Sequence, residues 1–496
     1  MKTSVRILLL VLAALMAISC LVACDSSDKN EETQQKQENT ASSGSVTEEE
    51  TLDPDVHPTI QKTDYADELY MHVFERPNYL WVEESEDDVF TEALFARQQK
   101  LYDYLGVDLY AVQTGNLNEY GDAFTTAVKN KDGSVDVLVC SAYVSIADFI
   151  IDGYLRDYND FDQIDLTADY WKTDYMEEVM LGDKIFLGYS EFNIFNTHVL
   201  SFNKRMLEQY SDALDESIYD TVRNYRWTID KMISLANLVY IDQTADGKTE
   251  DDTFGITGRQ WIPFIGFLHA SDIPLVAQDE TGTYRVAVYN STYQDKTTTL
   301  VEKLHALSKS DSAYFRFREE STADIPLSSG KVLMHIEGTG GLVHLLDYDI
   351  EFGVVPFPMY DEAQKDVGYR SFNYDGFITF PAYMRNESMS VESVEILSFF
   401  SDPVQTAYYA KQLGKQASDT PDDSEMLELV WDGICTDFGL AYSYISQSLD
   451  MNLYMLPTVT EANTTHAIAS YVKSYEGSAN KAIDKWMKTY EKKWGK

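Results

Sequence analysis

VDVLVCSAY, residues 135–143, is the stretch that decides the fold class. Its first six residues are apolar except for Asp136, which is typical of a strand covered on both faces in a parallel sheet. Ser141, Ala142 and Tyr143 end the strand, and a helical pattern begins near Ile146. Because ligands of open α/β sheets bind beyond the carboxyl ends of such strands, we expect Ser141 and Tyr143 to line a binding site.

Strand and helix patterns alternate through the rest of the chain. The run Gly330–Ile336 predicts a strand that leads into Gly338–Gly341 and a helix, and Thr228 predicts a helix N-cap. No internal repeat at a solenoid period is present. The alternation favours an α/β fold with helices over mixed sheets. Further strands are expected at 183–188, 195–202, 352–358 and 376–380, and further helices at 89–105, 391–400 and 469–493.

Charge and composition limit the classes of function. The 496 residues include 39 Lys and Arg against 82 Asp and Glu, a formal charge of −43, and 44% of them are hydrophobic. Nucleic-acid binding needs a basic face, and so does docking on anionic lipid by charge, so the excess of acids argues against both. The hydrophobic fraction supports a large core, and the length suits two large lobes.

The start of the chain has the pattern of an export signal. Lys2 and Arg6 precede the apolar run Ile7–Ile18, whose 12 residues are too few for a membrane span of about 20 but suit a secretory signal. Leu21–Cys24 resembles the bacterial lipobox, in which cleavage precedes the cysteine and the thiol carries a diacylglycerol. An ordinary secretory signal, or cleavage near Cys20, is the alternative.

This pattern predicts where the protein is located. We expect a signal peptide at 1–23, a lipidated Cys24, and attachment to the extracellular face of a bacterial cell membrane. Residues 24–59 are polar with few large apolar side chains, so they predict a disordered tether.

Six segments, taken in order, carry a resemblance to a known family. They are VDVL at 135–138, FNK at 202–204, WTIDK at 227–231, DGK at 246–248 with FGI at 254–256, GKVLM at 330–334, and FGVVPFP at 352–358. In this order, and behind a lipobox, they resemble the extracellular solute-binding proteins of ABC importers, family 1, in the carbohydrate-binding branch. The resemblance covers roughly residues 60–490.

The resemblance implies an α/β, two-lobed periplasmic-binding-protein-like fold with mixed sheets flanked by helices and a hinged cleft. Lobe 1 would comprise 60–196 with 351–405, and lobe 2 would comprise 197–350 with 406–490. An acidic insert near 210–225 and the segment 415–450 depart from the shorter family members, which leaves the cleft lining open.

The resemblance also implies the partners. We expect a carbohydrate ligand, in the first place an oligosaccharide, and the permease subunits of an ABC transporter with their ATPase. It implies binding without catalysis and without a cofactor. We further expect a monomer that meets the membrane only through its lipid anchor and binds no nucleic acid.

Sugar binding requires aromatic faces for the apolar sugar surface and polar groups for the hydroxyls. Gly338, Thr339 and Gly340 precede the expected helix, where free backbone N–H groups can donate to a ligand oxygen. The resemblance brings further candidates near the cleft from their loops, namely Trp171, Trp261, Tyr374 and Asp375. Core packing is the alternative for each of these aromatic residues.

Other functions have less support from the residues. The ligand could be a peptide or another polar solute, and a non-transport surface adhesin or sensor could share the fold. A secreted glycosidase would need two carboxylates facing across the cleft, and no motif nominates such a pair.

The sequence contains no motif for metal binding or redox chemistry. The eight histidines form no His-x-x-x-His pair, so no metal is expected. The acidic loop 242–252 begins like a calcium loop but is followed by Thr253 where an EF-hand needs Glu, so we interpret it as solvated and leave calcium open. Whether Cys140 and Cys435 form a disulfide is also open, and we expect Cys140 to be a buried apolar residue.

Overall fold

The computed structural model describes residues 55–74, 76–113, 117–142, 144–193, 197–259, 261–316, 326–414, 421–445 and 465–495. All of them belong to one unit, Asp55–Lys496. The expected signal peptide, Cys24 and most of the expected tether lie outside the described residues. No helix in the described ranges is long and apolar enough to cross a membrane.

The first sheet is built around the strand predicted at 135–139. β3 (Val137–Ser141) has all five residues buried and pairs in parallel with β1 (Asp67–Val73), as expected for a strand covered on both faces. β1 pairs in parallel with β2 (Val107–Gln113), and β13 (Asp375–Thr379) runs antiparallel to β3. The helices of this lobe are α2 (Val89–Leu105), α3 (Leu117–Asn130), α4 (Ile146–Asp152), α5 (Thr173–Glu177) and α11 (Glu387–Phe399).

Local sequence signals explain the bounds of α2. The carboxylate of Asp88 accepts the N–H of Phe90, so it supplies the N-cap. Gly106 ends the helix with a φ of 63°, a left-handed conformation that glycine adopts without strain. A Cβ at Gly106 would also lie 2.2 Å from the Asp64 carboxylate. The helix predicted at 89–105 therefore has the predicted bounds.

The second sheet is mixed. β10 (Val332–Gly338) lies at its centre, antiparallel to β4 (His198–Asn203) and parallel to β6 (Thr253–Arg259). The strand order is β11-β4-β10-β6-β5, and β9 also pairs with β6. The outer strands are β5 (Tyr240–Ile241), β9 (Ala313–Arg316) and β11 (Phe352–Val355), and the helices of this lobe are α6 (Lys204–Glu208), α7 (Ile218–Arg223), α8 (Ile229–Ala236), α9 (Trp261–Ala270), α10 (Gln294–Lys309) and α14 (Pro421–Asp432).

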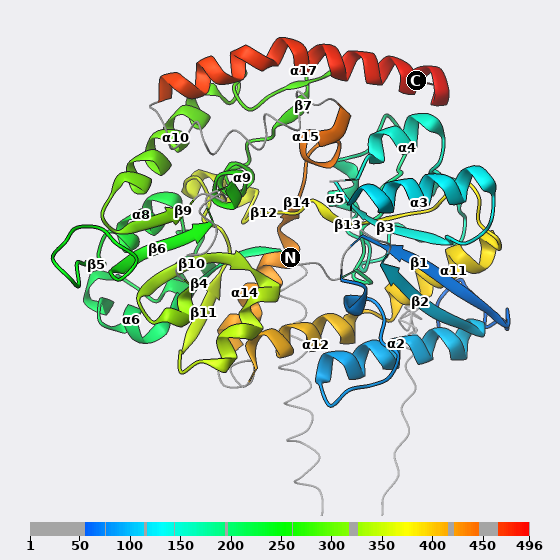
Figure 1. Cartoon of the computed structure of the whole chain (residues 1–496), viewed down its shortest axis with the longest axis horizontal. Coiled ribbons are helices and arrows are strands. Elements are labelled where there is room, and N and C mark those ends of the chain that lie inside the picture. The colour runs from blue at the N-terminus through cyan, green and yellow to red at the C-terminus, as the bar shows by residue number, and fades with distance from the viewer. Residues whose placement is uncertain are drawn as a thin grey trace, which may run out of the picture. The chain divides into compact units, whose positions relative to one another are not determined.

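The unit therefore has the two-lobed α/β architecture that the sequence predicts, with mixed sheets flanked by helices (Figure 1). Between the two sheets, β12 (Ser371–Phe372) pairs in parallel with β14 (Ile434–Cys435). The chain passes between the lobes at β12 and between Asn193 and β4, and β14 lies beside β12 at this junction. We call these three stretches the crossing segments.

Two helices contact both lobes. α12 (Asp402–Leu413) packs against α2 on one side and against α14 on the other. α17 (Thr465–Trp494) packs against α4 of lobe 1 and against β8 (Tyr284–Val286) of lobe 2, and Figure 1 shows it running across both lobes. The remaining elements are β7 (Val276–Gln278), α15 (Phe438–Ala441) and the 3-10 helices at 77–79, 158–160, 211–213, 327–329, 339–347, 362–366 and 443–445.

Three sequence-based boundaries are corrected by the structure. Residues 351–355 were assigned to lobe 1, but β11 pairs with β4, so this strand belongs to the sheet of lobe 2. The tether was expected to extend to residue 59, but His57 is 1% exposed and its N–H donates to the Tyr104 hydroxyl at 2.9 Å. The expected strand at 183–188 is a turn with isolated bridges, one of them between Gly188 and Ile378.

Other expectations are confirmed. Thr228 is the N-cap of α8, because its hydroxyl accepts the N–H of Lys231 at 3.3 Å. The stretch after Gly338 is helical, but as a 3-10 helix over 339–347. The C-terminal helix expected at 469–493 is α17.

Cys140 and Cys435 are both buried and free. Burial raises the pKa of the Cys140 thiol far above its usual range and that of Cys435 to about 12. We predict that both thiols resist a polar alkylating reagent at pH 8 in the folded protein and react once urea unfolds it. Thiol titration of a chain carrying Cys20→Ser and Cys24→Ser checks this. Rapid alkylation under native conditions would contradict the burial of both side chains.

Candidate functional site

Several predicted site residues lie at the facing ends of the two central strand pairs. In lobe 1, Ser141 at the end of β3 is paired with Asp375 at the start of β13, and the Ala142 N–H donates to the Tyr374 carbonyl at 2.7 Å. In lobe 2, Gly338 at the end of β10 is paired with His198 at the start of β4. The antiparallel pairing explains this, because it sets the end of one strand beside the start of its partner.

Phe372 of β12 connects these two strand ends. Its ring is stacked on His198, with centroids 4.9 Å apart and planes 6° from parallel. Its ring centroid also lies 5.8 Å from that of Tyr374. The candidates of lobe 1 and lobe 2 are therefore linked through a crossing segment.

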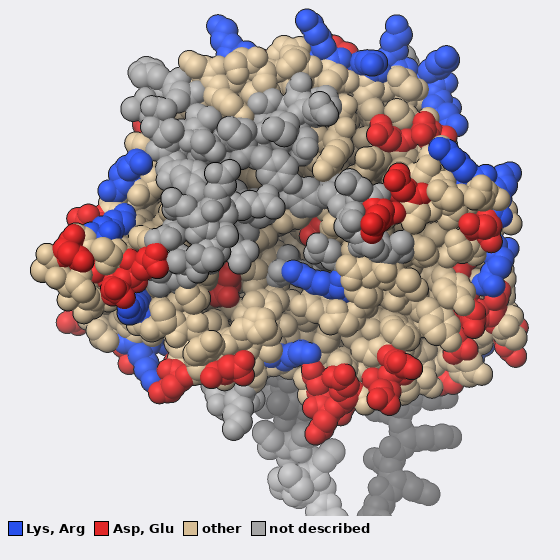
Figure 2. Space-filling model, in the orientation of Figure 1, with Lys and Arg blue, Asp and Glu red and all other residues tan. Residues whose placement is uncertain are grey.

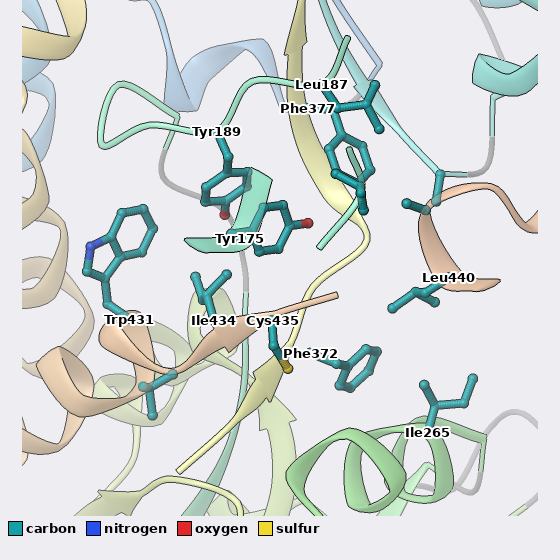
Figure 3. Close-up of a cluster of buried hydrophobic side chains, with 14 of the residues drawn as sticks. Tyr175, Leu187, Tyr189, Ile265, Phe372, Phe377, Trp431, Ile434, Cys435 and Leu440 are labelled. Carbon is teal, nitrogen blue, oxygen red and sulfur yellow. The ribbon is translucent and has the colours of Figure 1, made fainter. Parts of the chain in front are cut away.

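Aromatic and apolar side chains from both lobes are packed around the crossing segments. Figure 3 shows the rings of Tyr175 and Tyr189 side by side, near the segment that carries Trp431, Ile434 and Cys435. The ring centroids of Tyr189 and Trp431 are 5.9 Å apart. Tyr189 belongs to lobe 1 and Trp431 to α14 of lobe 2, so this cluster of side chains joins the two lobes.

A small pocket opens in this region. It encloses a void of about 10 Å³, roughly the space of one water molecule. Thr339, a predicted site residue, lines it, and the Thr339 hydroxyl lies 3.2 Å from that of Tyr408. The full lining is Thr197, Thr339, Tyr408, Tyr409, Leu427, Val430 and Trp431. The pocket therefore combines a crossing segment with α12 and α14.

Polar atoms without partners are concentrated here. Thr197 and Trp431 line the pocket, and the Oγ1 of Thr197 and the Nε1 of Trp431 are buried without a hydrogen-bond partner among the described residues. Two more such atoms, Asn193 Oδ1 and His198 Nδ1, belong to the same crossing segment. Buried polar atoms in folded proteins are nearly always hydrogen-bonded, so a group of them without partners indicates a place for a polar ligand or water.

Lys172 of lobe 1 covers the indole of Trp431. Its ammonium lies 4.8 Å from the ring centroid and 3.5 Å from the Asp432 carboxylate. Burial lowers the pKa of Lys172. The ammonium of Lys172 therefore occupies one face of the Trp431 ring, and a ligand that stacks on that face would have to displace it.

Trp171 is not brought to the pocket. It is 4% exposed, and its Nε1 donates to Glu395 at 2.9 Å inside lobe 1. Glu395 also accepts a hydrogen bond from the Tyr170 hydroxyl at 2.5 Å. Trp171 is therefore a core residue, which is the alternative given above for the aromatic candidates. Trp261 is the first residue of α9, but its side chain lies outside the described part of the structure. Tyr143 also lies outside the described part.

Sequence reasoning missed Tyr408, Tyr409 and Trp431. They lie on α12 and α14, which the chain reaches after it has passed through both sheets. No spacing distinguishes these rings from the many other tyrosines and tryptophans, because only the packing of α12 and α14 brings them to Thr339.

Metal ligands are not grouped in the described residues: no three or more His, Cys, Asp or Glu side chains there could hold an ion. In the loop 242–252, Asp242 accepts the N–H groups of Thr244 and Ala245, and Asp252 accepts those of Gln243 and Thr249. These carboxylates stabilise the turn of their own loop.

Comparison with known proteins finds likenesses among solved structures. No known family model matches the chain, and no curated protein matches it. A similar solved structure is the GacH receptor of Streptomyces glaucescens GLA.O, solved unliganded and in complex with acarbose and an acarbose homolog. The match covers 86% of this chain and 98% of that one, with 15% identity and a TM-score of 0.49. A likeness of this degree leaves the ligand to be derived from the site itself.

His198 makes the candidate site sensitive to acid. Complete burial lowers its pKa from the ordinary 6.5 to about 4. The unfolded chain therefore binds a proton as the pH falls below about 6.5 while the folded chain does not, so stability is lost toward pH 4. We predict that unfolding free energy falls by about 2 kcal/mol from this residue between pH 7 and 5.

Urea denaturation of His198→Phe at both pH values checks this prediction. The variant keeps an aromatic ring against Phe372 but cannot take up a proton. It should lose about 2 kcal/mol less than the wild type over the same interval. Equal acid sensitivity of the two proteins would assign the effect to other groups.

Proposed function

We propose that this protein is a lipid-anchored, extracellular solute-binding subunit of a bacterial ABC importer that captures a carbohydrate between its two lobes. The observation that carries the proposal is the pocket at the crossing segments, which combines three aromatic rings with buried polar atoms that have no partner. The family resemblance of the sequence supports the transporter partners, and the lipobox-like Leu21–Cys24 supports the anchor.

The chemistry of the pocket suits a sugar. A pyranose has apolar C–H faces that pack on rings such as those of Trp431 and Tyr409, and hydroxyls that need both donors and acceptors. Trp431 Nε1 is a donor and Thr197 Oγ1 can donate or accept. Specificity follows because a ligand without the matching hydroxyl leaves these buried atoms unpaired.

The mechanism is closure of the lobes on the ligand, without a covalent step. In the described conformation the void holds roughly one water molecule, so an oligosaccharide requires the lobes to separate first. The crossing segments are the elements about which such a hinge motion occurs. A ligand that contacts both lobes only when they are closed shifts the equilibrium toward the closed state. The permease would bind the protein in that closed state.

We predict that a carbohydrate stabilises the protein in a thermal-unfolding panel of mono- and oligosaccharides, peptides and polyols. A full-length chain carrying Cys24→Ser avoids the lipid. A ligand at 100 times its dissociation constant adds about 2.7 kcal/mol, which is readily seen as a melting shift. Stabilisation by peptides alone would replace the carbohydrate, silence across the panel would favour an adhesin or sensor, and product formation would favour a glycosidase.

Trp431→Ala tests the site itself. We expect calorimetry to show a sugar affinity at least ~10-fold weaker, because the stacking ring is removed, and Trp431→Phe to keep much of the binding. Trp171→Phe is the matched control, since that ring is equally buried but lies in the core of lobe 1. It should lower stability and leave the affinity unchanged. An unchanged affinity in Trp431→Ala would remove this pocket from the binding site.

Trp261→Ala tests whether Trp261, the remaining tryptophan predicted from the sequence, stacks on the ligand or packs in the core. Trp261 begins α9 in lobe 2. If its ring stacks on the sugar, the substitution abolishes binding measured by calorimetry while the melting temperature changes little. Retained binding with a lower melting temperature would identify Trp261 as a core residue.

A further inference from the structure

α17 presents a row of lysines on its exposed side. Lys473, Lys481, Lys485, Lys488 and Lys492 are all exposed, and we call them the lysine row. The last four are separated by four, three and four residues, a spacing that places them on one face of a helix. From Lys473 to Lys492 the row extends about 28 Å at a rise of ~1.5 Å per residue.

The opposite face of α17 is buried against the body of the protein. Ile468, Val472, Ala479 and Ile483 are fully or almost fully buried. The Trp486 indole donates to the Ala147 carbonyl at 3.2 Å, and the side-chain oxygen of Asn480 accepts the Val286 N–H at 2.9 Å. In the described conformation these contacts hold the helix against both lobes, so the lysine row faces outward.

The charge of α17 differs from that of the rest of the chain. The helix has six lysines and three acids, in a protein with a formal charge of −43. Asp484 is paired with Arg285 at 2.6 Å, whereas no lysine of the row is in an ion pair with a described residue. Figure 2 shows Lys and Arg side chains projecting along the edge of the molecule where α17 lies, and Asp and Glu over the lower edge.

We propose that the lysine row docks the protein on an anionic phospholipid surface. A straight row of cations can contact a flat sheet of phosphate headgroups along its whole length, with a gain of about fivefold in affinity per lysine at low salt. Protein–protein interfaces are instead depleted in lysine and centred on apolar or aromatic anchors. The exposed residues between the lysines are small, polar or acidic, namely Ser474, Gly477, Ser478, Asp484, Thr489 and Glu491, and offer no such anchor. Of the two acids, Asp484 is the one paired with Arg285.

Net charge does not forbid this contact. The Debye length is about 8 Å at physiological ionic strength, so a headgroup senses the nearest lysines more strongly than acids on distant faces. Docking of the lysine row on lipid does not depend on a bound carbohydrate. If the proposed anchor at Cys24 is present, it would hold the protein near the bilayer, and the lysine row would set which face meets it.

Vesicle co-sedimentation of residues 25–496 tests the proposal, because this chain lacks both the apolar run Ile7–Ile18 of the expected signal peptide and an acyl chain. We expect binding to phosphatidylcholine vesicles that contain roughly one third phosphatidylglycerol at about 0.05 M salt, and loss of binding at about 0.5 M salt. Pure phosphatidylcholine vesicles should not bind. Absence of binding to the anionic vesicles at low salt would overturn the proposal.

Two sets of variants with equal changes in net charge distinguish the effect of the lysine row on vesicle binding from the effect of overall charge. Lys481→Gln, Lys485→Gln and Lys488→Gln together should weaken binding about 100-fold, since each lysine contributes about fivefold. Lys131→Gln, Lys309→Gln and Lys365→Gln change the net charge equally at exposed positions elsewhere and should bind as the parent does. Equal weakening by both sets, or none by the first, would overturn the proposal. So would tighter binding to soluble polyglutamate than to vesicles, since the row would then recognise an acidic polypeptide.

The sugar panel separates this proposal from the proposed function. Both triple variants keep every residue of the pocket, so their ligand-induced melting shifts should equal that of the parent. Loss of vesicle binding with an intact melting shift would concern the lysine row alone, and the reverse result would concern the pocket alone.

Discussion

The carboxylate of Asp437 fixes the segment after β14 to lobe 2. One of its oxygens accepts the Leu275 N–H at 2.8 Å and lies 2.9 Å from His269 Nε2, and the other accepts the N–H groups of Gly439 and Leu440. A buried carboxylate is costly unless its oxygens are hydrogen-bonded, and here each oxygen has two partners. Because β14 pairs with β12, these bonds also position Phe372 and, through it, the facing strand ends of both lobes.

The crossing segments are tightly packed, yet they contain buried polar atoms without hydrogen-bond partners in the part of the chain that the structure describes. Phe372 lies between two imidazoles, 4.9 Å from His198 and 5.9 Å from His269, as expected in a tightly packed core. Yet His198 Nδ1 and Thr197 Oγ1 are buried there without partners in the described structure. A protein departs from complete hydrogen bonding mostly where function requires it. The same segments thus join the lobes and contain buried polar atoms without partners among the described residues, so the pocket lies at the junction of the lobes.

The sequence predicts what depends on neighbouring residues and misses what depends on distant ones. The strand at β3 and the N-cap at Thr228 follow from local patterns. Thr339, which the sequence nominates as a ligand-binding residue, lines the pocket. The place of β11 in lobe 2 depends on its pairing with β4, roughly 150 residues earlier in the chain, which no local pattern encodes. The two tryptophans differ in the same way. Trp171 is a core residue because Glu395 meets its indole N–H, whereas Trp431 lines the pocket because α14 packs beside α12.

Composition also misleads where charge is unevenly distributed. A net charge of −43 argues against docking on anionic lipid, and the sequence alone predicts contact with the membrane only through an acyl chain. That argument treats the charge as an average, although screening limits each charge to its surroundings within about 8 Å. The helical spacing of the lysines and the buried face of α17 direct the cations to the outward side of this helix, where they outnumber the acids. Local geometry, rather than total charge, therefore decides which surface this acidic protein can approach.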